Sequence, residues 1–222
     1  MSKSRLTLNQ TPVWVSQHSG KMDGILSIST STLDNRFCQC EFAEVCQYCY
    51  AKQFEPYRLT LETRLKENSK LLSSRLLKDS EVPRFEPDST VRFNSFGELI
   101  NRQHLDNLVK IAELNPKVHF GLWTKRYNLT FGRKFPGNLH LVASAFALDA
   151  YRKPSDAKAL LESHPEFDRV FVVTASNEDL NCSLECKSCL VCYRSGGPLL
   201  IREHLRHVNL KGAGLLESQE RP

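Results

Sequence analysis

Short apolar segments alternate with amphipathic segments along most of the chain. Five apolar runs have the length and the β-branched and aromatic content of strands: 25–30, 90–95, 118–124, 139–146 and 169–174. Three segments between them carry apolar residues at helical spacing or a helix start signal: 59–77, 102–114 and 155–163. Strands that alternate with helices indicate βαβ units and a parallel sheet. The pattern therefore predicts an α/β fold.

The two ends of the chain are less regular. Residues 12–15 are a further predicted strand, and 200–208 is a predicted basic helix. His204 and His207 lie three apart on that helix, where an ordinary solvent-facing position is favoured over metal binding. The segment after Gly212 is predicted to be loose. We expect an α/β unit over 1–178 that includes the first cysteine loop, and a cysteine-rich segment with the basic helix over 179–222.

Composition places the chain among ordinary globular proteins. It has 222 residues, of which 41% are hydrophobic and 25% charged. No apolar run approaches the ~20 residues that span a bilayer, and residues 1–5 lack a secretory apolar region. These features predict a cytoplasmic protein with no membrane partner. The formal charge of +5 permits a nucleic-acid partner without arguing for one.

All eight cysteines lie in two short windows, and this grouping predicts metal ligation. The first set is Cys38, Cys40, Cys46 and Cys49, and the second is Cys182, Cys186, Cys189 and Cys192. In a reducing compartment such sets are typical of thiolate metal ligands rather than of disulfides. Neither window contains a histidine or the long internal gap of most zinc sites. Iron–sulfur clusters are therefore favoured, with zinc as the alternative metal.

Three candidate features follow predicted strands. The first cysteine loop follows 25–30, Gly97-Glu98 follows 90–95, and the second cysteine set follows 169–174. In parallel α/β folds the chemistry lies beyond the carboxyl ends of the strands. Asn94 and Ser95 lie near one of these ends and are candidates for a cofactor pocket.

Cys40-x5-Cys46-x2-Cys49, with the aromatic Tyr48 before the last cysteine, resembles the cysteine loop of radical S-adenosylmethionine enzymes. The resemblance implies a partial (β/α) barrel in which three cysteines hold a [4Fe–4S] cluster whose fourth iron binds S-adenosylmethionine. Gly97-Glu98 resembles the glycine-rich motif whose acid accepts a hydrogen bond from the methionine amino group. The first gap is five residues instead of the usual three, and only one glycine is present.

The chain is also similar to the gene product 88 family of phage and mobile-element proteins. Four segments carry the similarity: Cys49-Tyr50-Ala51 with the helix after it, Arg92 to Glu98, Trp123 to Arg126, and Cys192-Tyr193. Together they span about residues 25 to 195. We know of no firmly assigned reaction for that family, so this resemblance implies fold and cofactor more than activity.

Several of these residues also have ordinary structural interpretations. Glu98 is equally expected as an acid at a helix N-terminus. The segment from Trp123 to Arg126 is expected to pack its tryptophan and solvate its cations rather than bind substrate. Arg92, inside an apolar strand, is expected to pair with a buried acid.

Two functional hypotheses follow. In the first, the protein is a radical S-adenosylmethionine-type enzyme with an unknown substrate, an electron donor, and an auxiliary cluster on the second cysteine set. In the second, it is a non-catalytic module of a virus or mobile element, with two closed iron–sulfur or zinc sites, that binds nucleic acid. Cys38 separates them, because a cluster held by four cysteines leaves no iron open for S-adenosylmethionine.

Overall fold

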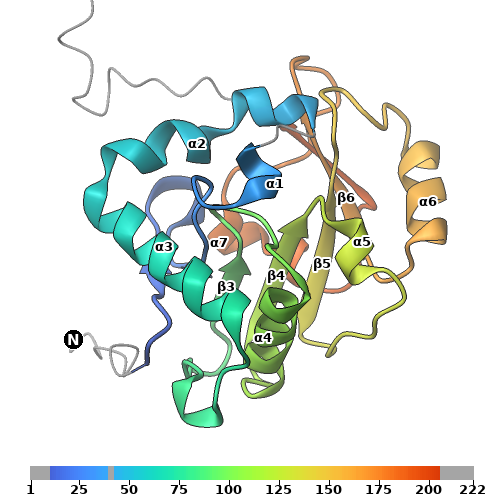
Figure 1. The fold of residues 1–222 in the computed structure, drawn as a ribbon. Helices are drawn as coiled ribbons and strands as arrows, with labels where there is room; N and C mark the ends of the chain where they lie inside the picture. The colour runs from blue at the N-terminus through green and yellow to red at the C-terminus, as the bar shows by residue number, and fades with distance from the viewer. Residues whose placement is uncertain (1–10, 40–42, 206–222) are drawn as a thin grey trace, which may run out of the picture.

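A seven-stranded sheet forms the centre of the computed structural model, which describes residues 11–39 and 43–205 (Figure 1). Its strands are β1 (Ser16–Gln17), β2 (Leu26–Ile28), β3 (Thr90–Phe93), β4 (His119–Thr124), β5 (Leu139–Ser144), β6 (Arg169–Thr174) and β7 (Leu200–His204). They lie side by side in chain order, and β1 is antiparallel to β2 while all other neighbours are parallel. The predicted mixed α/β fold is confirmed. The sheet is open, since β1 and β7 do not pair with each other within the described ranges.

Helices connect the parallel strands. The α-helices are α1 (Arg36–Gln39), α2 (Tyr50–Phe54), α3 (Leu59–Ser74), α4 (Arg102–Glu113), α5 (Tyr127–Thr130), α6 (Pro154–Ser163) and α7 (Cys186–Cys189). Short 3-10 turns are η2 (Gly20–Met22), η3 (Glu44–Tyr48), η4 (Glu55–Tyr57), η5 (Asp79–Glu81) and η6 (Val191–Tyr193). Helix α4 begins where the Asn101 side chain accepts a hydrogen bond from the His104 backbone N–H at 2.9 Å.

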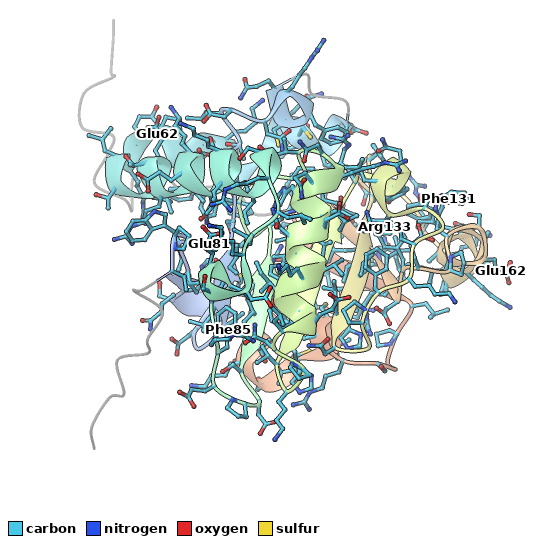
Figure 2. The ribbon with its side chains drawn as sticks, turned by 60° about the horizontal axis from the view of Figure 1, so that its bottom comes forward. Glu62, Glu81, Phe85, Phe131, Arg133 and Glu162 are labelled. Carbon is cyan, nitrogen blue, oxygen red and sulfur yellow. The ribbon has the colours of Figure 1, made fainter. Side chains whose placement is uncertain are left out.

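The two faces of the sheet are covered by different material. On one face, side chains such as Phe93, Phe120 and Leu141 form the large core with Leu72 of α3 and Leu105 of α4. Figure 2 shows this helical layer from another side, with Glu62 of α3 and Glu162 of α6 at opposite ends and α4 between them. Because neighbouring strands follow each other in sequence, the main helices lie together on this face.

The opposite face carries a smaller core. Strand residues alternate between the two faces, so Trp123 of β4 and Val142 of β5 point away from the large core. They pack there with Met22, Ile25 and Tyr193. The second cysteine set and η2 therefore cover the face that α3 and α4 leave open.

The structure corrects two predictions at the ends of the chain. Residues 12–15 form no strand; Val13 is buried in the large core, and β1 comes immediately afterwards. The predicted helix 200–208 is wrong for its described part, because Leu200–His204 is strand β7, paired in parallel with β6. Pairing with the exposed edge of β6 satisfies the backbone and buries Leu200, which outweighs the local pattern. His207 and the segment after Gly212 lie outside the described residues.

Within the described ranges, no helix is both long and apolar enough to cross a membrane.

Candidate functional site

The first cysteine segment, residues 36–49, follows β2 at the carboxyl edge of the sheet (Figure 1). Cys38 lies in α1, Cys46 in η3, and Cys49 directly after η3. Cys40, predicted as a ligand, lies outside the described residues. The expected position of this segment at a strand end is confirmed.

Glu55 anchors the chain that leads into this segment. Its fully buried carboxylate accepts hydrogen bonds from the hydroxyls of Ser31 and Thr32, and from the Thr32 backbone N–H at 2.8 Å. A buried carboxylate is tolerated only with such partners. Sequence reasoning missed Glu55, because nothing local distinguishes it from a solvated acid.

The thiols of the first segment share one electrostatic environment. The pKa of the Cys38 thiol is raised, first by burial, then by the negative charges of Glu98, Cys49 and Cys46. Burial also raises the pKa of Cys46, and Lys125 opposes that shift. Cys38 is therefore no distant spare thiol. Lys125, which was expected to lie in solvent, is the cation that acts on both Cys38 and Cys46.

Glu98 lies beside the cysteines, but the hydrogen bonds to its carboxylate come from neighbouring residues of the protein. One carboxylate oxygen accepts from the Leu99 N–H at 2.7 Å and from the Thr124 hydroxyl at 2.6 Å, and the other accepts from the Lys125 N–H at 2.7 Å. Burial raises its pKa, while Lys125 and the hydrogen bonds act in the opposite direction. A carboxylate has about four acceptor positions, so Glu98 joins the loop after β3 to the end of β4 and keeps little capacity for a ligand.

Gly97 has a clear physical requirement. Its φ is +74°, and a Cβ there would lie 2.4 Å from the Thr30 carbonyl oxygen. Glycine is needed because two backbone segments approach each other here, which differs from the expected approach to a ligand.

The other predicted pocket residues lie at the same edge. Asn94 is 5% exposed, has a φ of +56°, and neither atom of its side-chain amide has a described partner. The Ser95 hydroxyl lies 2.8 Å from that of Ser29 and 3.1 Å from that of Ser27. Tyr50, missed by the site prediction, donates its hydroxyl proton to the Ser95 carbonyl. Tyr48 is 39% exposed.

The second cysteine segment, residues 182–193, lies against the smaller core. Cys186 and Cys189 are the ends of α7, Cys192 lies in η6, and Cys182 lies in the loop after β6. Cys186 and Cys192 pack against the smaller core, to which Trp123, Val142 and Tyr193 belong. The pKa of both thiols is raised by burial, to about 11 for Cys192, and nearby arginines oppose the shift.

Arg92 lies between the two segments. Its guanidinium stacks over the Trp123 ring at 4.1 Å, and one N–H points to the Met22 sulfur at 3.6 Å. Its electrostatic neighbours are Tyr193, Tyr50, Cys186 and Glu203. The expected pairing with a buried acid is not found, because no described carboxylate lies within ion-pair distance of Arg92.

The strand end from Trp123 to Arg126 has structural contacts. Trp123 packs in the smaller core, and Thr124 binds Glu98. Arg126 donates to the carbonyls of Leu99 and Ile100 and stacks over Phe37 at 5.1 Å. The expected packing of the tryptophan is confirmed. Lys125 and Arg126, by contrast, face protein groups.

In the part of the chain that the structure describes, no three His, Cys, Asp or Glu side chains are placed so that they could hold a metal ion. An open hollow of about 650 Å³ lies at the opposite edge of the sheet, beside His119, Asn138 and His140. None of the predicted site residues lines it. We therefore place the candidate site at the cysteine segments, where the chemistry is concentrated, and not at this hollow.

One comparison with known proteins, against protein families, finds a match that covers the cysteine segments and the strand ends. The family model described as gene product 88 matches residues 3–202, a range that includes both cysteine segments, Arg92 and Glu98. No curated protein and no solved structure matches the chain. The match covers most of the sequence, and the chain belongs to the gene product 88 family.

Proposed function

We propose that this protein is an iron–sulfur protein with two cysteine-ligated clusters, and that it works as a radical S-adenosylmethionine-type enzyme on an unknown substrate. One observation carries the proposal: Cys38, Cys46 and Cys49 lie in the short elements that follow β2 at the carboxyl edge of a parallel sheet, where Glu98, Cys49 and Cys46 act electrostatically on Cys38. In parallel α/β proteins this edge is where active sites form.

The arrangement of the sheet supports the proposal. Strands β2 to β7 follow one another in chain order, as in (β/α) barrels, and the large helices cover one face. The other face and the carboxyl edge are left to the two cysteine segments. A partial barrel that opens toward its cofactor is the fold we propose from this order.

The donor chemistry suits a thiophilic metal. Each cysteine set offers up to four thiolates within a short stretch, with no competing oxygen-rich acidic cluster. Cys46 and Cys49 are proposed ligands of the first cluster, with Cys38 or Cys40 as the third. The cysteine side chains must turn toward a common point to bind metal. When bound, the reduced cluster and S-adenosylmethionine would supply the radical chemistry.

The chain's own residues would bind and orient the cofactor. Asn94 offers a buried donor and a buried acceptor without described partners. Glu98 would accept from an ammonium group with its remaining lone pair, and Lys125 would offset the negative charge of the thiolates. Ser95 and Tyr50 hold the end of β3 against the cysteine segment.

A second candidate function depends on whether Cys38 binds the first cluster. If Cys38 and Cys40 both bind together with Cys46 and Cys49, the first cluster is closed and cannot bind S-adenosylmethionine. The protein would then be a metal-binding module, and its net charge of +5 suits a nucleic-acid partner.

Anaerobic purification followed by spectroscopy tests the proposal. We expect a brown protein whose reduced cluster gives an electron paramagnetic resonance signal that changes when S-adenosylmethionine is added, with formation of 5′-deoxyadenosine. A Cys46→Ser/Cys49→Ser variant is the control and should lose the response while it keeps the second cluster. A colourless, zinc-loaded protein would exclude both clusters. A signal indifferent to S-adenosylmethionine would favour the closed-cluster module.

A further inference from the structure

Two buried arginines lie beneath the second cysteine segment with N–H groups left over. Arg169 is 1% exposed; it donates from Nη2 to the Arg194 and Gly196 carbonyls, and its Nε and Nη1 have no described partner. Arg92 likewise has an unpartnered, buried Nε. Arg92 is in register with Gly121 of β4, and Arg169 is in register with Val142 of β5. Residues in register on neighbouring parallel strands point to the same face of the sheet, so both arginines point to the face on which the second cysteine segment packs.

Both arginines lie beside this segment: Arg169 donates to the Arg194 carbonyl, two residues after Cys192, and Arg92 stacks over Trp123, whose ring contacts Tyr193. Arg92 and Arg169 are also the cations that act on the Cys192 thiol, and Arg92 acts together with Lys21 on Cys186. Cys186 and Cys192 pack against the smaller core to which Trp123 belongs. The guanidinium groups are therefore held under the sulfur-bearing segment by packing.

No carboxylate neutralises these arginines. Among the described acids, none forms an ion pair with Arg92 or Arg169. Glu203 is the carboxylate whose charge acts on Arg92, and it is already paired with Lys21. Buried cations with unpaired N–H groups are costly unless an anionic partner is present.

The charges suit a metal–thiolate centre. Three cations act on the Cys186 or Cys192 thiol, Lys21, Arg92 and Arg169, against one carboxylate, Glu203. Four thiolates around a divalent zinc ion, or around a [4Fe–4S] core of charge plus two, carry minus two. Hydrogen bonds and cations around cluster sulfurs are also known to set metal affinity and reduction potential.

We infer that Arg92 and Arg169 are positioning residues for the second metal centre, which compensate the charge of a tetrathiolate site on Cys182, Cys186, Cys189 and Cys192 and donate N–H groups to its sulfurs. This inference rests on the proposed function only in requiring that the second cysteine set binds metal. It does not depend on the first cluster or on S-adenosylmethionine.

The test uses zinc as the probe, because zinc and iron–sulfur centres present the same four thiolates. Zinc affinity is measured under reducing conditions by competition with a colorimetric chelator, in the full chain carrying Cys46→Ser/Cys49→Ser. We expect Arg92→Met and Arg169→Met each to weaken binding about tenfold or more, as for other groups that hydrogen-bond to metal ligands. Arg92→Lys should retain more affinity than Arg92→Met, because it keeps the charge.

Arg202→Met is the matched control. Arg202 is also a buried arginine, 8% exposed and with an unpartnered Nε, but it donates to the Arg152 carbonyl and is in register with Val172 of the large core, so its side chain lies on the opposite face of the sheet. Its replacement should leave zinc affinity unchanged. Arg92→Gln and Arg169→Gln provide uncharged polar versions if the methionine variants do not fold, and the same weakening is expected of them.

The outcomes distinguish the inference about the two arginines from the proposal that the second cysteine set binds metal. If the parent protein binds zinc at the second set and the Arg92 and Arg169 variants bind it equally well, this inference is wrong while the metal-binding proposal stands. If the parent binds no metal at the second set, both are wrong for that segment. Weakening that is confined to the Arg92 and Arg169 variants supports the inference.

Discussion

The Tyr193 ring lies over the α-carbon of Gly121. A Cβ at Gly121 would be 2.7 Å from Tyr193 Cδ1 and 2.8 Å from the Trp123 ring. The bare glycine in the middle of β4 therefore admits the aromatic residue that ends the second cysteine segment, and Tyr193 is in edge-on contact with Trp123 at 5.3 Å. The segment is fixed to the sheet by this close approach.

Gly121→Ala should loosen the second cysteine segment. The added methyl group overlaps two packed rings, and overpacking of this kind costs about 1–3 kcal/mol. The free energy of unfolding, measured by chemical denaturation, should fall by that amount, and metal binding at the second set should weaken. Gly137→Ala is the control, because a Cβ at Gly137 meets nothing within 4 Å. Equal stability of the two variants would contradict the packing described here.

Gly97→Ala should destabilise the loop after β3 more than a positive φ alone explains. Gly97 and Gly132 have similar φ values, +74° and +72°, but only at Gly97 would a Cβ meet the Thr30 carbonyl oxygen, at 2.4 Å. Gly132→Ala should cost about 1–2 kcal/mol from backbone strain, and Gly97→Ala distinctly more. Thermal unfolding of both variants measures the difference. A loss at Gly97 no larger than at Gly132 would refute the close approach.

Glu55→Ala should release the start of the first cysteine segment. It leaves the Thr32 N–H and the hydroxyls of Ser31 and Thr32 without their acceptor in a buried site. Unsatisfied buried groups cost about 1–3 kcal/mol each, so stability and metal content of the first set should both fall. Glu62→Ala is the control and should change neither by much, because Glu62 of α3 is only half-buried and its partner is Lys66 in an i,i+4 surface ion pair, which is worth about 0.3–0.5 kcal/mol. Metal content equal to the parent protein would show that Glu55 does not position the segment.

His104 should make the protein less stable in acid. Burial lowers its pKa from 6.5 to about 3, so the folded protein keeps it neutral while the unfolded chain binds a proton near pH 6.5. The stability that depends on neutral His104 is complete above that pH and is lost as pH falls from 6.5 toward 3. The slope for one proton approaches about 1.4 kcal/mol per pH unit. His104→Leu should show a smaller loss of unfolding free energy between pH 7 and 5 than the parent, and an equal loss would rule out this role.

Much of the fold could be predicted from local patterns. The apolar runs that became β3, β4, β5 and β6 are short and bounded by turn residues or charges, and α3 and α4 have regular apolar faces. Strand β7 could not be predicted in this way. Its sequence, Leu-Ile-Arg-Glu-His, is helix-compatible, and only pairing with β6, about 30 residues earlier, makes it a strand.

The candidate site could likewise be predicted from the sequence only in part. The cysteines, Gly97 and Glu98 are visible as spaced motifs. The structure places Gly97, Glu98 and the described cysteines of the first set at the expected edge, and the second cysteine set over one face of the sheet. Glu55 and Gly121 carry no local signal, since each matters through a partner distant in the sequence. Lys125 was visible as part of the segment from Trp123 to Arg126, directly after β4, but its electrostatic effect on the cysteines was not.

Cys38 and Cys40 are the residues on which the enzyme hypothesis depends. Cys38 lies with Cys46 and Cys49, and Cys40 lies outside the described residues. We expect Cys46→Ser to remove the first cluster, and one of Cys38→Ser and Cys40→Ser to leave it in place. Iron content per chain, measured after anaerobic purification, distinguishes them. Loss of the cluster in both single variants would instead indicate four-cysteine ligation.

The central claim is that both cysteine sets hold iron–sulfur clusters. The most direct measurement is the amount of iron and acid-labile sulfide per chain after anaerobic purification, in the parent protein and in Cys46→Ser/Cys49→Ser. Two [4Fe–4S] clusters predict about eight irons and eight sulfides in the parent and about four of each in the variant. Stoichiometric zinc without sulfide, or an iron content that the variant does not change, would contradict the claim.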